Sequence, residues 1–230
     1  MNPHNPDAVF RTRVILEDLE AVRENLLALS DDIWSSIDHN DSEAMEAGVE
    51  FKRSYNAKVT AFDAVAGELS LLIQQYTSVR LDSNEQSGEI DESSNERIIS
   101  ELDRETAHGL DEDFTFKRPF GFILDGKATT GLTTWQRLYQ LVCERLIAQD
   151  EGRMRSLCDH PDFVSNRGNR TIEHDPQKLR KPMMLAGGLF IESNLSANGI
   201  RDVIRRLLEQ YAIPAEKMKV YLRQDRNAQE

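Results

Sequence analysis

Apolar residues recur at alternating steps of four and three along the first third of the chain. One series runs from Ile15 to Ile33, and a second, longer one runs from Tyr55 to Tyr76. This is the a/d spacing of a coiled coil, and it predicts two long helices, the second over about residues 43–77. The predicted contact positions, which we also assign to oligomerisation, are Ile15, Leu19, Val22, Leu26, Leu29, Ile33, Tyr55, Val59, Phe62, Ala66, Leu69, Ile73 and Tyr76.

A cluster of turn-forming residues, Asp38 to Asp41, separates the two series. Because this connection is short, the helices must pack antiparallel as a coiled-coil hairpin, which we assign to residues 1–78. One seam leaves further apolar side chains uncovered, and these are Phe10, Leu16, Leu27, Trp34, Phe51 and Leu72. We expect a second copy of the chain to cover them, giving a homodimer through the hairpin. Packing against another protein or against the chain's own C-terminal half is the alternative.

Residues 79–114 lose this periodicity. They are rich in Asp, Glu and Ser and poor in apolar residues, which predicts an acidic, largely disordered linker. Within it, Asn95 to Glu105 could form a short helix that presents Ile98, Ile99 and Leu102. A solvated tether is one interpretation. The other is an acidic arm that occupies the C-terminal half and competes there with a polyanion.

Residues 115–230 alternate strand and helix patterns. Asp125-Gly126 is a tight-turn dipeptide that predicts a β-hairpin over about residues 119–130. Helical spacing follows from Trp135 to Leu146 and from Ile200 to Tyr211, and Met218–Leu222 alternates as a closing strand. The pattern predicts an α+β domain, a small mixed sheet with helices on one face, joined to the helical hairpin by the acidic linker.

The net charge of the chain also changes sign between residues 114 and 115. Residues 1–114 carry 9 Lys and Arg against 26 Asp and Glu, a net of −17, and residues 115–230 carry 19 against 14, a net of +5. The two halves therefore suit different partners. No run approaches the roughly 20 apolar residues of a membrane span, and the first residues lack the pattern of a signal peptide. Cys143 and Cys158 lack metal-site spacing, so we expect a cytoplasmic protein with reduced thiols and no membrane partner.

Three segments of the C-terminal half carry a family resemblance. Residues 116–126 read Phe-Lys-Arg-Pro-Phe-Gly-Phe-Ile-Leu-Asp-Gly, Trp135 opens the next helix, and residues 190–198 read Phe-Ile-Glu-Ser-Asn-Leu-Ser-Ala-Asn. Here the chain resembles a C-terminal α/β domain attached to varied, mostly uncharacterised bacterial proteins. The resemblance covers about Phe116 to Leu222. It implies a setting near restriction or phage-defence systems and carries no assigned catalytic residues.

The segment that leads into the last predicted helix is the first candidate site. A helix N-terminus presents unpaired N–H groups and the positive end of the helix dipole, which suits a phosphate. The residues expected to bind this anion are Asn194, Ser196, Asn198, Arg201 and Arg205. The alternative is that they are ordinary helix caps and ion-paired residues of the helix surface.

A basic set is the second candidate site. Its members are Arg167, Arg170, Lys178, Arg180 and Lys181. Lys and Arg contact the phosphates of nucleic acid, and Asn166 and Asn169 could add hydrogen bonds. A net charge of +5 is modest for a nucleic-acid-binding domain, so solvated surface charge is the alternative.

No catalytic constellation emerges from the sequence. A metal-dependent nuclease needs two or three converging acids with a lysine nearby, and the candidate acids are Asp125, Glu173 and Glu192. Turn formation explains Asp125, and no Glu-x-Lys pattern follows the other two acids. Cys158 and His160 cannot be placed as nucleophile and base by spacing alone. We therefore assign no catalytic residue, no metal and no cofactor.

The predicted function is that of a non-enzymatic oligomeric interaction or adaptor protein, in a bacterial defence or DNA-related system. It would dimerise through the hairpin and bind another protein or a phosphate-bearing ligand through its C-terminal domain. The alternative is a nucleic-acid-binding or metal-dependent nuclease component of a phage-defence system. Salt-sensitive binding to DNA or RNA is the signature of that alternative.

Overall fold

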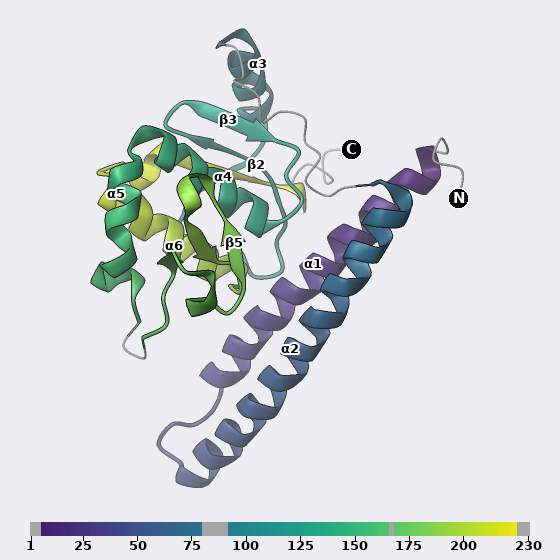
Figure 1. Ribbon diagram of the computed structural model, residues 1–230, viewed down its shortest axis with the longest axis vertical. Helices are drawn as coiled ribbons and strands as arrows, with labels where there is room; N and C mark the ends of the chain where they lie inside the picture. The colour runs from purple at the N-terminus through teal and green to yellow at the C-terminus, as the bar shows by residue number, and fades with distance from the viewer. Residues whose placement is uncertain (1–5, 80–91, 166–167, 225–230) are drawn as a thin grey trace. The chain divides into compact units, whose positions relative to one another are not determined.

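The protein folds as two compact units, Met1–Glu85 and Gln86–Glu230. Its structure, a computed structural model, describes residues 6–79, 92–165 and 168–224 (Figure 1). The first unit is helical, and the second combines short strands with helices, so the predicted α+β class is confirmed. No helix in these ranges is long and apolar enough to cross a membrane.

Two long helices make up the hairpin, α1 over Pro6–Ser35 and α2 over Ser42–Thr77, as predicted. The side chain of Asp41 accepts hydrogen bonds from the backbone N–H groups of Glu43 and Ala44, which satisfies two donors at the start of α2. Ser78 ends the helix in a left-handed conformation and returns its N–H to Gln74. Local capping therefore sets both ends of α2.

The contact between α1 and α2 differs from the predicted seam. Tyr55 donates its hydroxyl to the Leu26 carbonyl at 2.9 Å, and Lys52 Nζ donates to the Ser30 carbonyl at 2.9 Å. Five predicted contact residues are instead exposed, namely Ile15, Val22, Leu29, Leu69 and Tyr76. Each helix carries two lines of residues that lie one position apart around its axis. The two helices contact each other along the line that contains small side chains, such as Ala66 and Ser70, and the hydrogen-bonding residues Tyr55 and Lys52. At the closed end of the hairpin, a Cβ at Gly48 would overlap the side chain of Ile37 in the connection between the helices.

Four antiparallel strands form the first sheet of the second unit. They are β1 (Ala107–His108), β2 (Pro119–Leu124), β3 (Lys127–Thr130) and β7 (Met218–Leu222), in the order β1-β7-β2-β3. Asp125 and Gly126 both have positive φ, 45° and 78°, as a type I′ turn requires, so the predicted β-hairpin is confirmed.

Helices α4 (Trp135–Gln149) and α6 (Ala197–Gln210) lie on one face of this sheet, and α5 (Glu151–Ser156) follows α4. Thr134 caps α4 and Ser196 caps α6 through their side-chain oxygens. The apolar stripes of the two helices enter one core with Phe122 and Val220 of the sheet. The 3₁₀ turns of this unit are Leu157–Asp159, Pro161–Phe163, Pro176–Lys178, Ala186–Gly188 and Ala215–Lys217.

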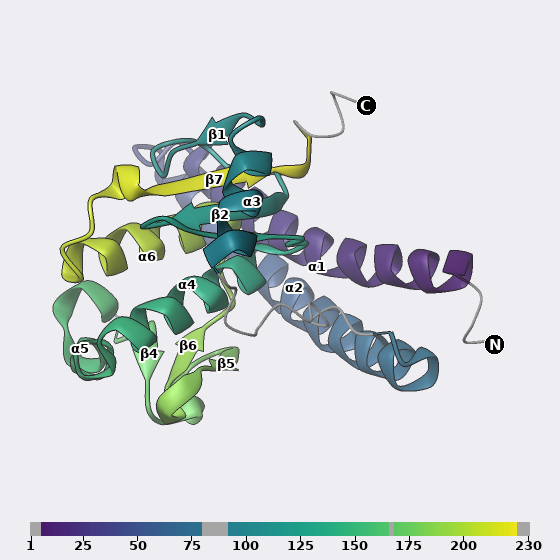
Figure 2. The same ribbon diagram turned by 90° about the horizontal axis from the view of Figure 1, so that it is seen from above.

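A second, separate sheet replaces the predicted single mixed sheet. It contains β4 (Ile172–Glu173), β5 (Pro182–Met184) and β6 (Phe190–Glu192) in the antiparallel order β4-β6-β5. Figure 2 shows it beyond α4, apart from the first sheet. Ile172 and Ile191 join the apolar core that contains α4, so these short strands cover that helix rather than extend the first sheet.

Part of the predicted linker is folded, which corrects the prediction of disorder for residues 92–114 and confirms the short helix expected within it. Helix α3 (Glu92–Leu102) buries Ile98 and Leu102 against Ile123 and Tyr221, on the sheet face opposite α4 and α6 (Figure 1). Helices therefore cover both faces of the first sheet. Residues 80–91 of the predicted linker lie outside the described part of the chain.

Asn95 of α3 also closes the edge of the sheet at β3. Its side chain donates to the Gly126 carbonyl and accepts from the Ala128 N–H, both at 2.9 Å. Arg145 donates to the Ala128 carbonyl from the other side at 3.0 Å. An edge strand whose backbone groups are satisfied in this way cannot readily pair with another strand.

Candidate functional site

The predicted anion site at the start of α6 is a junction within the chain itself. The hydroxyl of Ser196 caps the first turn of the helix. Asn198 Oδ1 accepts from the Phe114 N–H at 2.9 Å and from Arg201 Nη1 at 3.0 Å. Arg201 Nη1 also donates to the Glu112 carbonyl at 2.6 Å. These bonds join α6 to the segment that precedes β2.

An acid of that segment, Asp113, already binds Asn198. Its Oδ1 accepts from the Thr115 hydroxyl at 2.6 Å, from the Thr115 N–H at 2.8 Å and from Asn198 Nδ2 at 2.7 Å. The hydrogen bonds from Thr115 and Asn198 lower the pKa of Asp113 from 3.8 to about 2. An anion of the chain therefore already occupies one of the predicted phosphate donors, the side-chain amide of Asn198.

The remaining predicted anion ligands do not join this junction. Asn194 gives its backbone N–H to Glu192 at 2.8 Å. Arg205 is exposed on α6. The structure thus brings Ser196, Asn198 and Arg201 together and leaves the other two residues apart.

The low pKa of Asp113 gives a pH-dependent contribution to stability. Because the pKa is lowered on folding, the contribution is complete above about pH 4 and is lost as the pH falls towards about 2. The side chain is exposed, so we expect less than ~1 kcal/mol. Urea unfolding at pH 5 and pH 2.5 should show a smaller pH-dependent loss for Asp113→Asn than for the parent. A carboxyl titration by NMR that gives a pKa near 3.8 would contradict this expectation.

Two members of the predicted basic set pair with an acid buried on β4. Glu173 is 4% exposed, and its Oε2 lies 3.1 Å from Arg170 Nη1 and 3.3 Å from Lys178 Nζ. Arg170 also contacts Asp159 at 2.9 Å. Burial by itself raises the pKa of Glu173, but the His174 N–H and the two cations outweigh it and lower the pKa overall.

The next two members of the basic set surround a second buried acid, Glu192 on β6. Its Oε2 accepts from the Arg180 N–H at 2.7 Å, and its Oε1 accepts from the N–H groups of Lys181 and Asn194 at 3.1 and 2.8 Å. The Arg180 guanidinium lies 3.7 Å from the same carboxylate. With 4% exposure, Glu192 is the centre of a loop junction.

Ion pairing within the chain therefore explains both the basic set and the candidate nuclease acids Glu173 and Glu192. Arg170, Lys178 and Arg180 pair with Glu173 or Glu192, which reduces the positive charge that they present to a polyanion. Arg167 lies outside the described residues. Sequence reasoning missed this pairing although one pattern pointed to it: Arg170 and Lys178 flank Glu173 by three and five residues.

The surroundings of the other catalytic candidates, Asp125, Cys158 and His160, also indicate structural roles. Asp125 occupies the type I′ turn and lies 3.5 Å from Lys217. Burial raises the pKa of Cys158, which disfavours its thiolate. His160 Nδ1 accepts the Asp162 N–H at 3.3 Å, as a cap of the turn that follows. Among the described residues, no three His, Cys, Asp or Glu side chains are grouped so that they could hold a metal ion.

Most of the large apolar side chains that are exposed among the described residues lie on the hairpin. In the described part of the chain, twelve large apolar side chains are exposed, and ten of them lie on α1 and α2. These ten are Phe10, Ile15, Val22, Leu29, Phe51, Val65, Leu69, Leu71, Leu72 and Tyr76. Apolar surface gathered on one element, beyond a few hundred Å², marks an interaction site.

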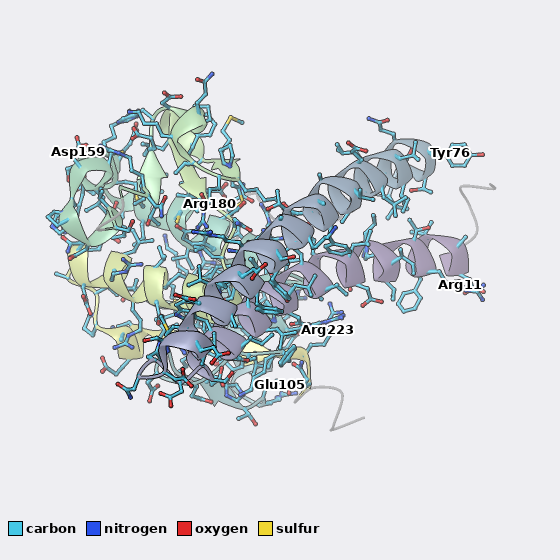
Figure 3. All side chains as sticks on the ribbon, turned by 90° about the horizontal axis from the view of Figure 1, so that it is seen from below. Arg11, Tyr76, Glu105, Asp159, Arg180 and Arg223 are labelled. Atoms are coloured by element: carbon cyan, nitrogen blue, oxygen red, sulfur yellow. The ribbon has the colours of Figure 1, made fainter. Side chains whose placement is uncertain are left out.

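A groove continues this surface at the open end of the hairpin. It has a volume of about 440 Å³. Ile15 and Ile73 form its apolar walls, and Asp7, Arg11, Thr12 and Thr77 are among its rim residues. Figures 2 and 3 show α1 and α2 diverging towards this end, where Arg11 and Tyr76 lie. The hairpin therefore presents both an apolar face and a recess.

Comparisons with protein-family models, with curated proteins and with solved structures found no match to this chain.

Proposed function

We propose that this protein is a non-enzymatic interaction or adaptor protein that acts as a homodimer through its helical hairpin. The observation that supports it is the concentration of exposed apolar side chains on α1 and α2. Removing apolar surface from water contributes about 25 cal/mol per Å², so a partner that covers these side chains is favoured. The C-terminal unit then serves to bind a second protein in the cytoplasm.

The bacterial defence or DNA-related setting rests on the resemblance of residues 116–222 to a domain of bacterial proteins. Nucleic-acid binding has weaker support than protein binding, because Arg170, Lys178 and Arg180 pair with buried acids. A phosphate ligand at α6 has weaker support for a similar reason, since Asp113 and Asn198 bond to each other.

The test is purification of the full chain from its native cell under mild conditions, with mass spectrometry of copurifying material and absorbance at 260 nm. We expect a stoichiometric protein partner and no nucleic acid. Bound nucleic acid that leaves at high salt would overturn the adaptor function and favour the nucleic-acid alternative. If the chain purifies with neither a protein partner nor nucleic acid, this result would also count against an adaptor.

A further inference from the structure

Seven of the exposed apolar residues form two regular stripes on the hairpin. On α1, Ile15, Val22 and Leu29 repeat every seven residues, and on α2 the steps are four, three and four. The α2 stripe consists of Val65, Leu69, Leu72 and Tyr76. Their exposed fractions range from 38% at Leu29 to 75% at Tyr76, so neither stripe is buried between α1 and α2.

Both stripes stand in the same relation to the contact between the helices. Val22 comes one residue before Arg23, which lies 3.5 Å from Asp63 of α2, and Leu29 comes one residue before Ser30, which bonds to Lys52. The α2 stripe residues each precede one that is buried or lines the groove, in the order Ala66, Ser70, Ile73 and Thr77.

This relation places the stripes on one side of the hairpin. Successive residues of an α-helix are rotated by about 100°. In an antiparallel pair, positions rotated in the same sense from the contact line point to the same side of the pair. The seven residues therefore make one apolar face, which we call the stripe face: Ile15, Val22, Leu29, Val65, Leu69, Leu72 and Tyr76.

Charge along the hairpin indicates where a partner contacts this face. Residues 1–79 carry 6 Lys and Arg against 14 Asp and Glu, so two copies repel one another over most of their length. From Leu69 to Thr77, however, α2 has no charged residue. On α1, the charged residues that line the groove at this end, Asp7 and Arg11, are of opposite sign, so a second copy contacts this end with little net like-charge repulsion.

From these observations we infer that the stripe face is the dimer interface, and that its occupant is the same face of a second copy of this chain. Two hairpins placed face to face around a two-fold axis form a four-helix bundle, in which each subunit contributes the same patch. With on the order of 100 Å² exposed per side chain, the seven residues present several hundred Å², comparable to the roughly 800 Å² per partner of a stable interface. The inference rests on the proposed oligomeric function and specifies its surface.

Adjacent leucines on α2 provide a matched test. Leu72 belongs to the stripe face and is 63% exposed, whereas Leu71 is 60% exposed but points away from that face. Both side chains are exposed in the single chain, so glutamate at either position should leave the hairpin folded, as far-UV circular dichroism would verify. In the full chain, Leu72→Glu is expected to raise the dimer dissociation constant at least tenfold, because each subunit then buries a carboxylate in an apolar interface. Leu71→Glu should change it less than threefold.

Sedimentation equilibrium or light scattering over a concentration series distinguishes the outcomes. A parent dimer that Leu72→Glu weakens and Leu71→Glu does not is the expected result. A dimer that resists Leu72→Glu would overturn the stripe face as the interface but leave the oligomeric function intact. A parent chain that stays monomeric at about 100 μM would overturn self-association altogether, while a copurifying protein partner would still support an adaptor.

Discussion

Glu192→Ala is expected to destabilise the C-terminal unit by about 3–4 kcal/mol. The substitution removes a carboxylate that accepts three backbone N–H groups in a buried loop junction, from Arg180, Lys181 and Asn194. Buried donors left without an acceptor each cost about 1–3 kcal/mol, and the loop relaxes only in part. If Glu192 served mainly to bind a ligand or metal, its removal would instead leave stability nearly unchanged or raise it.

Urea unfolding measures this effect if the two units are observed separately. In a Trp34→Phe background, the fluorescence of Trp135 reports the C-terminal unit alone. Glu192→Gln keeps one oxygen acceptor and should lose about half as much stability as the alanine variant. Glu209→Ala, on the exposed side of α6, is the control and should shift stability by less than ~0.5 kcal/mol. Equal effects of the Glu192 and Glu209 variants would sink the assigned structural role.

Trp135→Ala should lower the stability of the same unit by about 3–5 kcal/mol, the usual cost of truncating a buried aromatic side chain. Trp135 is 1% exposed, lies 4.7 Å from Phe114 between ring centroids and donates its indole N–H to the Lys117 carbonyl at 2.8 Å. It thereby ties the start of α4 to the segment that also bonds α6. Loss of the ring leaves both a cavity and an unpaired carbonyl.

Trp135→Phe separates the two contributions. It keeps an aromatic ring and removes the hydrogen bond, so we expect a loss of only about 1–2 kcal/mol. Because these variants lack the fluorescent probe, hydrogen exchange read by mass spectrometry on peptides of α4 and α6 is the appropriate measurement. Slow exchange retained in the alanine variant would show that Trp135 contributes little to this core.

Local interactions made several elements predictable from sequence. The ends of α2 follow from turn and capping groups within a few residues of the chain, as at Asp41. The type I′ turn at Asp125-Gly126 needs two positive φ values, which this dipeptide supplies at low cost. The apolar stripe of α6 faces the core because one helical period places all its large residues on one side. Such features depend on residues that are close in sequence, so they can be predicted without knowledge of the fold.

Pairing between distant residues could not be predicted in this way. Asp113 and Asn198 are 85 residues apart, and Asn95 reaches Ala128 across 33. The acidic composition of residues 92–114 predicts disorder when the segment is considered alone. The prediction changes when the sheet face on which the segment packs is taken into account. Once Ile123 and Tyr221 form that face, Ile98 and Leu102 gain apolar surface to bury, and α3 folds onto it.

The sequence by itself determined two long helices, a tight turn, an α+β C-terminal unit and the split in charge, because each depends on local spacing or on composition. Tertiary structure alone decided which apolar stripe of the hairpin is buried between α1 and α2 and which is left outside. The stripes lie one residue apart, and the outer one contains the larger apolar side chains, so apolar spacing alone favours the wrong stripe as the contact between the helices. The hydrogen bonds from Tyr55 and Lys52 to carbonyls of α1 favour the stripe that is buried, and Leu72 and Tyr76 consequently face outward.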